Sequence, residues 1–236
     1  MVIFEDDQII AFNKPAGLSS QGGRIAAHTL DDLLWVFARP GHARPRLIHR
    51  LDRDTSGVIL TARTAPAAAL GRAMMARRMK KTYLAIVAPG APAPREGRIV
   101  TALRRESIGS QAYVRTCEAK DPGAMAASTG YRTLGACEAA ALVELSPRTG
   151  RMHQLRVHMA SIGRPIAGDA RYGGTLVLTG APVARMMLHA AALAFVHPSG
   201  EPLILAAPLP DDMAQALHSL GMAAPAARNA RQADPF

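Results

Sequence analysis

Short apolar runs broken by turn-forming residues are the feature that most constrains the fold of this chain. Most of these runs alternate or are continuously apolar and are bounded by Gly, Pro, Asn or Asp, which is the pattern of β-strands. Between residues 98 and 146, several further runs separated by polar turns indicate an antiparallel sheet with long loops. The clearest strand candidates are Val2–Phe4, Ile9–Asn13, Gly57–Ala62, Lys81–Val87, Met187–Val196 and Leu203–Ala207.

Helical spacing is confined to a few places. Thr29 is placed as the N-cap of a helix that runs to Phe37 and ends before Pro40. Further helices are predicted over 64–78, 153–162 and 211–220. Many strands with few helices predict an α+β fold, built on a central mixed or antiparallel β-sheet flanked by helices and loops.

The length and the composition indicate a packed globular protein. The chain has 236 residues, of which 49% are hydrophobic and 19% are charged. We expect one domain over 1–220 and a disordered tail over 221–236, which is rich in Ala, Arg and Pro. The three prolines within 89–97 predict a connection that crosses between substructures.

The net charge of +10 makes a polyanion the natural large partner, because phosphate contacts release counterions. A basic surface that serves solubility alone fits the charge equally well. The two cysteines, Cys117 and Cys137, have neither CxxC spacing nor the partners of a metal site, which indicates buried or idle thiols.

Targeting signals are absent from the sequence pattern. The first residues include Glu5, Asp6 and Asp7 and lack a basic stretch followed by an apolar one, so we expect no secretory signal. A membrane helix needs about 20 apolar residues in succession, and the chain has no such run. We therefore expect a cytoplasmic protein without a membrane partner.

Two short segments concentrate polar side chains. The segment 49–57 places two carboxylates and two guanidiniums before an apolar strand, and 149–158 places basic groups at the start of a predicted helix. Functional groups are often displayed where a loop enters a strand. Taken alone, the first segment could be a solvated turn with local ion pairs, and the second a basic helix face.

Three other chemistries fail on spacing. His153 and His158 are five positions apart without a following Glu, so the zinc-protease helix signature is absent. Ser56 lacks the Gly-x-Ser-x-Gly turn of serine hydrolases. The glycine pairs at 22–23 and 173–174 match neither phosphate-binding loops nor the dinucleotide fingerprint. We expect no metal and no nucleotide cofactor.

Taken together, the polar segments resemble the RluA-like family of RNA pseudouridine synthases, and the resemblance covers about Val2 to Pro210. The family motifs that this sequence matches are, in chain order, Asp7 with Asn13–Leu18, His49–Asp52 with Thr55–Gly57, Lys81–Ala85, Gly150–His158, Gly168-Asp169 with Tyr172-Gly173, and Leu188–Ala190.

The resemblance implies three catalytic residues. Asp52 matches the family's catalytic aspartate, which attacks the sugar carbon or removes a ribose proton. Arg156 matches the arginine that pairs with this aspartate and keeps it ionised. Tyr83 matches the tyrosine that stacks on the target base, with an ordinary strand tyrosine as the alternative. Asp54 falls at a variable position and is read as a surface or structural carboxylate.

The resemblance also implies substrate contacts. Arg50 would fill the space left by the flipped nucleotide, or would brace the loop. Leu188 would pack against the base, or would be a plain core leucine. Over 104–121 we expect either a loop that embraces the substrate or a solvated hairpin. The remaining residues predicted to bind substrate are His49, Arg151, His153 and Gln154.

We therefore expect a monomeric, cofactor-free enzyme that isomerises uridines in a stem-loop of ribosomal or transfer RNA, held in an RNA-binding cleft. The first family motif lies close to Met1, so we expect no separate N-terminal RNA-binding domain. A catalytically silent RNA-binding module on the same fold is the alternative. The joint presence of Asp52, Tyr83 and Arg156 favours the enzyme, because a silent module would not need all three.

Overall fold

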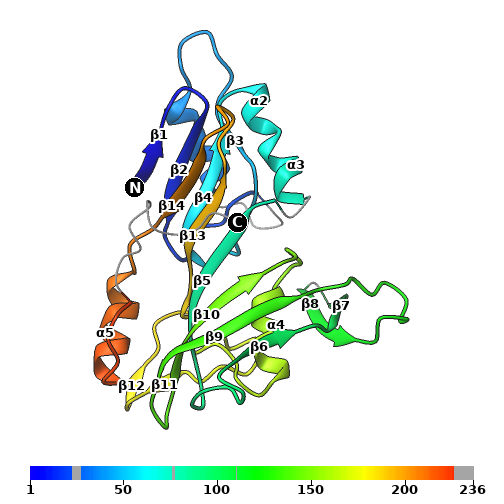
Figure 1. The fold of residues 1–236 in the computed structure, drawn as a ribbon, viewed down its shortest axis with the longest axis vertical. Helices are drawn as coiled ribbons and strands as arrows, with labels where there is room; N and C mark the ends of the chain where they lie inside the picture. The colour runs from blue at the N-terminus through cyan, green and yellow to red at the C-terminus, as the bar shows by residue number, and fades with distance from the viewer. Residues whose placement is uncertain (23–27, 76–77, 110, 226–236) are drawn as a thin grey trace. The chain divides into compact units, whose positions relative to one another are not determined.

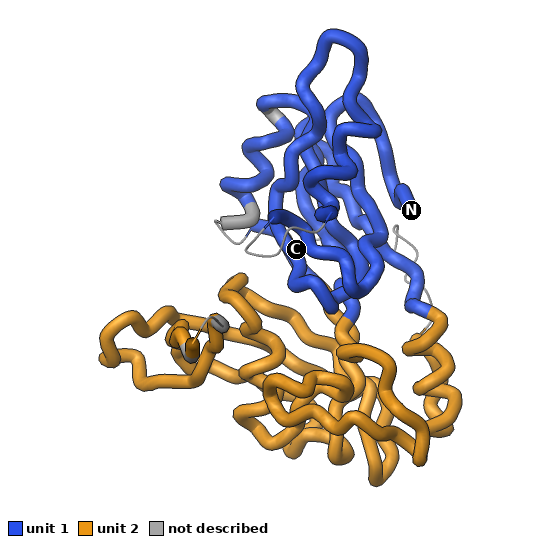
Figure 2. Tube along the Cα trace, turned by 180° about the vertical axis from the view of Figure 1, so that it is seen from behind, with its two compact units in different colours: residues 1–81, 189–210, 226–236 blue, residues 82–188, 211–225 orange. Residues whose placement is uncertain are grey.

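The computed structural model describes residues 1–22, 28–75, 78–109 and 111–225 (Figure 1). These residues form two compact units (Figure 2). The first is built from 1–81 and 189–210, and the second from 82–188 and 211–225. The single domain expected over 1–220 stays a prediction, and residues 226–236 of the expected tail lie outside the described residues.

A mixed sheet organises the first unit. Its strands follow the order β1-β2-β4-β13-β14, with β3 also paired to β4. Neighbours are antiparallel except for β4 and β13, which run parallel. The strands are β1 (Val2–Glu5), β2 (Ile9–Lys14), β3 (Arg46–Leu47), β4 (Ser56–Ala62), β13 (Leu188–Val196), whose first residue belongs to the second unit, and β14 (Pro202–Ala206).

The core of the first unit lies on this sheet. All of β4 is buried, and Leu60 packs with Ile9 and Phe195 from the neighbouring strands. Two short helices, α2 (Ala65–Ala68) and α3 (Leu70–Met75), follow β4 in the chain (Figure 1). Their residues Ala67 and Leu70 belong to the same apolar cluster. Another helical segment consists of α1 (Leu30–Leu33) and the 3-10 turn η1 (Leu34–Phe37).

An antiparallel sheet organises the second unit, in the order β5-β10-β9-β6. The helix α4 (Gln154–Ser161) buries Leu155 and Met159 against Val143 and Leu145 of β10. The remaining elements are β5 (Lys80–Val87), which begins in the first unit, β6 (Glu96–Ile99), β7 (Ala102–Ile108), β8 (Gln111–Cys117), β9 (Thr129–Ala136), β10 (Ala141–Pro147), β11 (Val177–Leu178), β12 (Ala181–Pro182) and α5 (Asp211–Ser219).

The architecture confirms the predicted α+β class with a mixed sheet. Thr29 is the N-cap of α1: its hydroxyl accepts from the Asp32 N–H, and the Asp32 carboxylate accepts from the Thr29 N–H. The predicted helix over 64–78 is divided at Ala69 into α2 and α3. None of the described helices has the length and apolar composition that a membrane crossing requires.

One prediction about connectivity is wrong. The proline-rich stretch 89–97 does not cross between substructures, because it lies wholly within the second unit, where it joins β5 to β6. Prolines mark where regular structure stops, but they carry no information about which strands the stretch connects.

The parallel contact between β4 and β13 depends on Gly57. The backbone of Gly57 has φ +113°, and a Cβ at this position would lie 2.1 Å from the carbonyl oxygen of Ala190. Ala190 is the residue that pairs with Gly57 in the two strands. Both the backbone conformation and the close approach therefore require glycine, which accounts for the glycine of the motif Thr55–Gly57.

Replacing Gly57 with Ala should lower the free energy of unfolding by more than about 3 kcal/mol, since strain and a backbone clash add together. Urea unfolding followed by circular dichroism measures this change. Gly71→Ala is the matched control: Gly71 lies in α3, where an added Cβ would meet Ile48 at 3.8 Å, so stability should rise by up to ~1 kcal/mol. Equal stabilities for the two variants would contradict this account of β4 and β13.

Candidate active site

The loop that carries Asp52 is fixed on its N-terminal side by Ser20. The Ser20 hydroxyl donates to the carbonyl oxygen of Leu51 at 2.8 Å and accepts from the Leu51 N–H at 3.0 Å. On the other side of Asp52, the Thr55 N–H donates to the Asp52 carbonyl at 3.1 Å and closes a turn. The half-buried Asp52 side chain is therefore presented by a backbone with little freedom.

Lys14 fixes the same loop on its C-terminal side. Its side chain is buried, with 1% of its surface exposed, and its ammonium donates to the carbonyl oxygens of Pro15 and Leu18 at 2.7 Å and of Arg53 at 3.0 Å. The Gly17 N–H donates to the same Arg53 carbonyl. A buried ammonium is stable when its N–H groups have acceptors. The segment 14–20 therefore holds the residues on both sides of Asp52.

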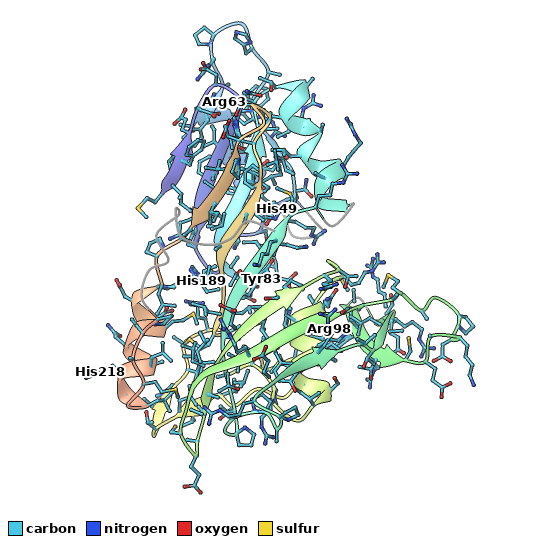
Figure 3. All side chains as sticks on the ribbon, viewed as in Figure 1. His49, Arg63, Tyr83, Arg98, His189 and His218 are labelled. Atoms are coloured by element: carbon cyan, nitrogen blue, oxygen red, sulfur yellow. The ribbon has the colours of Figure 1, made fainter. Side chains whose placement is uncertain are left out.

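His49, which is labelled in Figure 3, extends the pairing of β3 with β4 through its side chain. The Ile48 N–H donates to the Leu60 carbonyl, and the Leu60 N–H donates to His49 Nε2 at 3.1 Å. An accepting Nε2 requires the neutral imidazole. Burial and the nearby Lys81 ammonium lower the pKa of His49 to about 4, which agrees with this role. The structure thus gives His49 a part in holding the loop, while its contact with substrate stays a prediction.

Arg50 and Asp54 lie at the surface of the same loop. Arg50 is exposed, as a residue that contacts substrate must be. Asp54 forms an ion pair with Arg53 at 2.9 Å, with 45% and 62% of their side chains exposed. Such an exposed pair contributes little to stability. Asp54 therefore occupies the surface position expected from the sequence.

In the second unit, α4 presents Arg156 to Asp169. Nε and Nη2 of Arg156 donate to the two carboxylate oxygens of Asp169, each at 2.7 Å. The Arg156 side chain is 12% exposed and that of Asp169 is 1% exposed. The Tyr172 ring lies 4.9 Å from the guanidinium carbon. A paired fork and an aromatic face together fix the plane of the guanidinium.

Gln154 holds the turn before α4. The residue is 3% exposed. Its Oε1 accepts from the Thr149 hydroxyl and the Arg151 N–H, and its Nε2 donates to the Ser128 carbonyl and the Thr129 hydroxyl. These four bonds are the full number that an amide side chain makes. A contact of Gln154 with substrate, as predicted, would have to displace one of them.

The histidines around α4 have different surroundings. His153 has φ 52° at the N-cap, and its Nδ1 lies 2.8 Å from the Tyr172 hydroxyl. His158 is fully buried between the Thr129 hydroxyl and the Thr101 carbonyl, and burial lowers its pKa. Within the described ranges, no group of three or more His, Cys, Asp or Glu side chains could hold a metal ion.

Tyr83 and Leu188 belong to the apolar cluster of the second unit. Tyr83 lies on β5 (Figure 3). It pairs with Leu145 of β10 and is half-buried. Leu188 is 3% exposed and is a member of the same cluster. Arg151 is exposed before α4, where its Nε donates to the Ala126 carbonyl. The contacts of all three with substrate stay predictions.

Several residues of the site were given no role from the sequence. Ser56 Oγ lies 3.0 Å from Nδ1 of the buried His189, and this contact links β4 to β13. The signal for most of them was their place in a family motif, because their partners are distant in the chain. The residues are Lys14, Ser20, Ser56, Asp169, Tyr172 and His189.

Asp52 belongs to the first unit, whereas Tyr83 and Arg156 belong to the second. The pairing of Asp52 with Arg156 and the RNA-binding cleft therefore stay predictions.

Comparisons with known proteins give one family. The family model described as RNA pseudouridylate synthase matches residues 8–161. Ribosomal large subunit pseudouridine synthase D of Nitrosomonas europaea is 38% identical over 229 residues, and the alignment covers 93% of this chain and 64% of the relative. Synthase C of Escherichia coli strain K12 is 34% identical over an alignment of 238 positions, which covers 98% of this chain and 71% of that relative.

Solved structures agree with the sequence relatives. Human RNA pseudouridylate synthase domain containing 4 superposes with a TM-score of 0.79 at 27% identity, covering 95% of this chain and 94% of the human one. The human domain containing 1 gives a TM-score of 0.68 at 30% identity, covering 88% and 82%.

The neutral His49 predicts a dependence of stability on pH. Its pKa is about 4 in the folded protein and 6.5 ordinarily, so the unfolded chain takes up the proton first as pH falls. Its contribution is complete above pH 6.5 and is lost as pH falls to about 4, amounting to at most ~3 kcal/mol. Urea unfolding of the wild type and of His49→Gln across this range should give a difference in stability that shrinks with acid.

His218→Gln, at an exposed position on α5, is the matched control and should follow the wild-type curve. A constant difference between wild type and His49→Gln at all pH values would show that His49 does not titrate in this way.

Proposed function

We propose that this chain, which belongs to the RNA pseudouridylate synthase family, isomerises uridine to pseudouridine in ribosomal RNA. The observation that carries the proposal is the alignment with relatives named ribosomal large subunit pseudouridine synthases over 93% and 98% of this chain. The net charge of +10 supports a polyanionic substrate. A stem-loop of transfer RNA is the alternative substrate. We also propose that the enzyme acts as a cytoplasmic monomer.

Asp52 is proposed as the catalytic carboxylate. The reaction breaks the bond between N1 of uracil and C1′ of the ribose, rotates the base, and joins its C5 to C1′ with loss of the C5 hydrogen. A carboxylate begins it by attacking C1′ or by removing a ribose proton. The fixed backbone around Asp52 supports this role, because Leu51 and Arg53 are both held by the segment 14–20 and a positioned group reacts faster than a mobile one.

Arg156 and Tyr83 are proposed to serve the same uridine. The guanidinium of Arg156 is held by Asp169 and Tyr172, so the orientation of its plane is fixed. Such a preorganised charge stabilises a carboxylate or a developing negative charge. Tyr83 offers a half-buried ring that can stack on the base.

Exposed arginines are proposed to bind the RNA backbone. Arg50 and Arg151 are exposed near the proposed catalytic residues along the chain. The hairpin of β7 and β8 adds the exposed Arg105 and Arg115. Guanidiniums bind phosphates as bidentate partners, which supports both groups as contacts for RNA. The proposed contact with the flipped nucleotide rests on Arg50.

Replacing Asp52 with Asn should abolish pseudouridine formation while leaving the fold and the affinity for RNA nearly unchanged. Asn keeps the size and part of the hydrogen bonding of Asp, but it can neither attack the sugar nor take a proton from it. Tritium release from RNA labelled at C5 of uridine measures the reaction, because the new carbon bond expels that hydrogen. Asp54→Asn is the control, since its carboxylate lies at the surface of the same loop.

If Asp52→Asn released tritium at the wild-type rate and Asp54→Asn did not, Asp54 and not Asp52 would be the catalytic carboxylate. Full activity of both variants would remove the carboxylate mechanism. If the wild type binds RNA without any release of tritium, the chain is the catalytically silent module.

A further inference from the structure

The β7–β8 hairpin is docked on α4, the helix that carries Arg156. Val114 of β8 is 1% exposed and packs with Leu103 of β7 and Val157 of α4 in a small apolar cluster. Tyr172, from the loop after α4, packs against the same cluster. The hairpin and Arg156 are therefore parts of one packed substructure of the second unit.

Tyr172 contacts both parts at once. Its hydroxyl accepts from the Val114 N–H at 3.1 Å, and its ring lies 4.9 Å from the guanidinium carbon of Arg156. The hydroxyl also lies 2.8 Å from His153 Nδ1 at the start of α4. Burial raises the pKa of Tyr172, so the group stays a neutral hydroxyl that can accept from Val114 and donate to His153.

The neighbouring Arg171 holds the same strand. Its Nη1 donates to the Ala112 carbonyl at 2.9 Å, and its guanidinium carbon lies 4.8 Å from the Tyr113 ring. Its backbone N–H donates to Asp169, the partner of Arg156. The loop that fixes Arg156 thus contacts three successive residues of β8, which are Ala112, Tyr113 and Val114.

We propose that Tyr172 is a positioning residue that holds the β7–β8 hairpin and the Arg156 guanidinium in one arrangement, so that RNA bound by the hairpin is presented in register with Arg156. The inference rests on the proposed function, because it gives the hairpin an RNA substrate. It assigns separate tasks to the two parts of the side chain: the hydroxyl fixes the hairpin, and the ring fixes the guanidinium.

Two substitutions separate these tasks. Tyr172→Phe keeps the ring beside Arg156 and removes the hydroxyl's hydrogen bonds with Val114 and His153, so KM for RNA should rise at least about 3- to 10-fold, the effect of one ordinary hydrogen bond, with little change in kcat. Tyr172→Leu removes the ring as well, so kcat should fall in addition to the rise in KM. Tyr131→Phe, on β9 with its ring over Gly97, is the matched control and should keep both wild-type parameters.

Hydrogen exchange tests the coupling without using activity. In Tyr172→Phe, nuclear magnetic resonance should show faster exchange of the Val114 amide, about 3- to 10-fold, and an unchanged Arg156 Nε–H resonance. In Tyr172→Leu, the Arg156 resonance should shift as well. A wild-type KM together with wild-type exchange at Val114 in Tyr172→Phe would overturn the proposal, as would equal losses of kcat in both variants.

The two proposals fail in different ways. If the wild type releases no tritium from any RNA, the synthase function fails while the exchange rates still report whether Tyr172 holds the hairpin. If the wild type is active and Tyr172→Phe matches it in KM and in exchange, the positioning role alone fails.

Discussion

The buried ammonium of Lys14 is the interaction on which the loop around Asp52 depends. It binds carbonyl oxygens of Pro15, Leu18 and Arg53, and Arg53 lies 39 positions from Lys14 in the chain. Without this cation the three carbonyls would lose a buried donor, which costs more than an ordinary hydrogen bond gains. With Ser20 on the other side of Asp52, the ammonium makes the loop a rigid extension of the sheet.

The second unit also depends on a nearly buried cation, which here is an arginine. The nearly buried guanidinium of Arg156 is acceptable because Asp169 neutralises it through two hydrogen bonds and Tyr172 covers one face. Gln154 and His158 complete their hydrogen bonding with backbone and hydroxyl groups around the same helix. Because these polar groups are paired, α4 holds the Arg156 guanidinium in a fixed orientation.

The sequence predicted what local patterns determine. The alternation of apolar residues located the main strands, and Thr29 as an N-cap located the start of α1, because both depend on neighbours in the chain. Other roles depend on contacts between distant residues: His49 accepts from Leu60 within one sheet, and His189 meets Ser56 across 133 positions. A residue pattern named these side chains, but it could not distinguish substrate contact from structural pairing. The prediction that 89–97 crosses between substructures was wrong for the same reason.

The most direct test of the account is to incubate the purified chain with unmodified transcripts of large-subunit ribosomal RNA and of transfer RNAs, and then to map pseudouridine by carbodiimide modification and primer extension. The account predicts new stops in the ribosomal transcript that require the protein. Protein-dependent stops in transfer RNA alone would correct the substrate. The absence of protein-dependent pseudouridine from every transcript, although the protein is folded and binds RNA, would contradict the account.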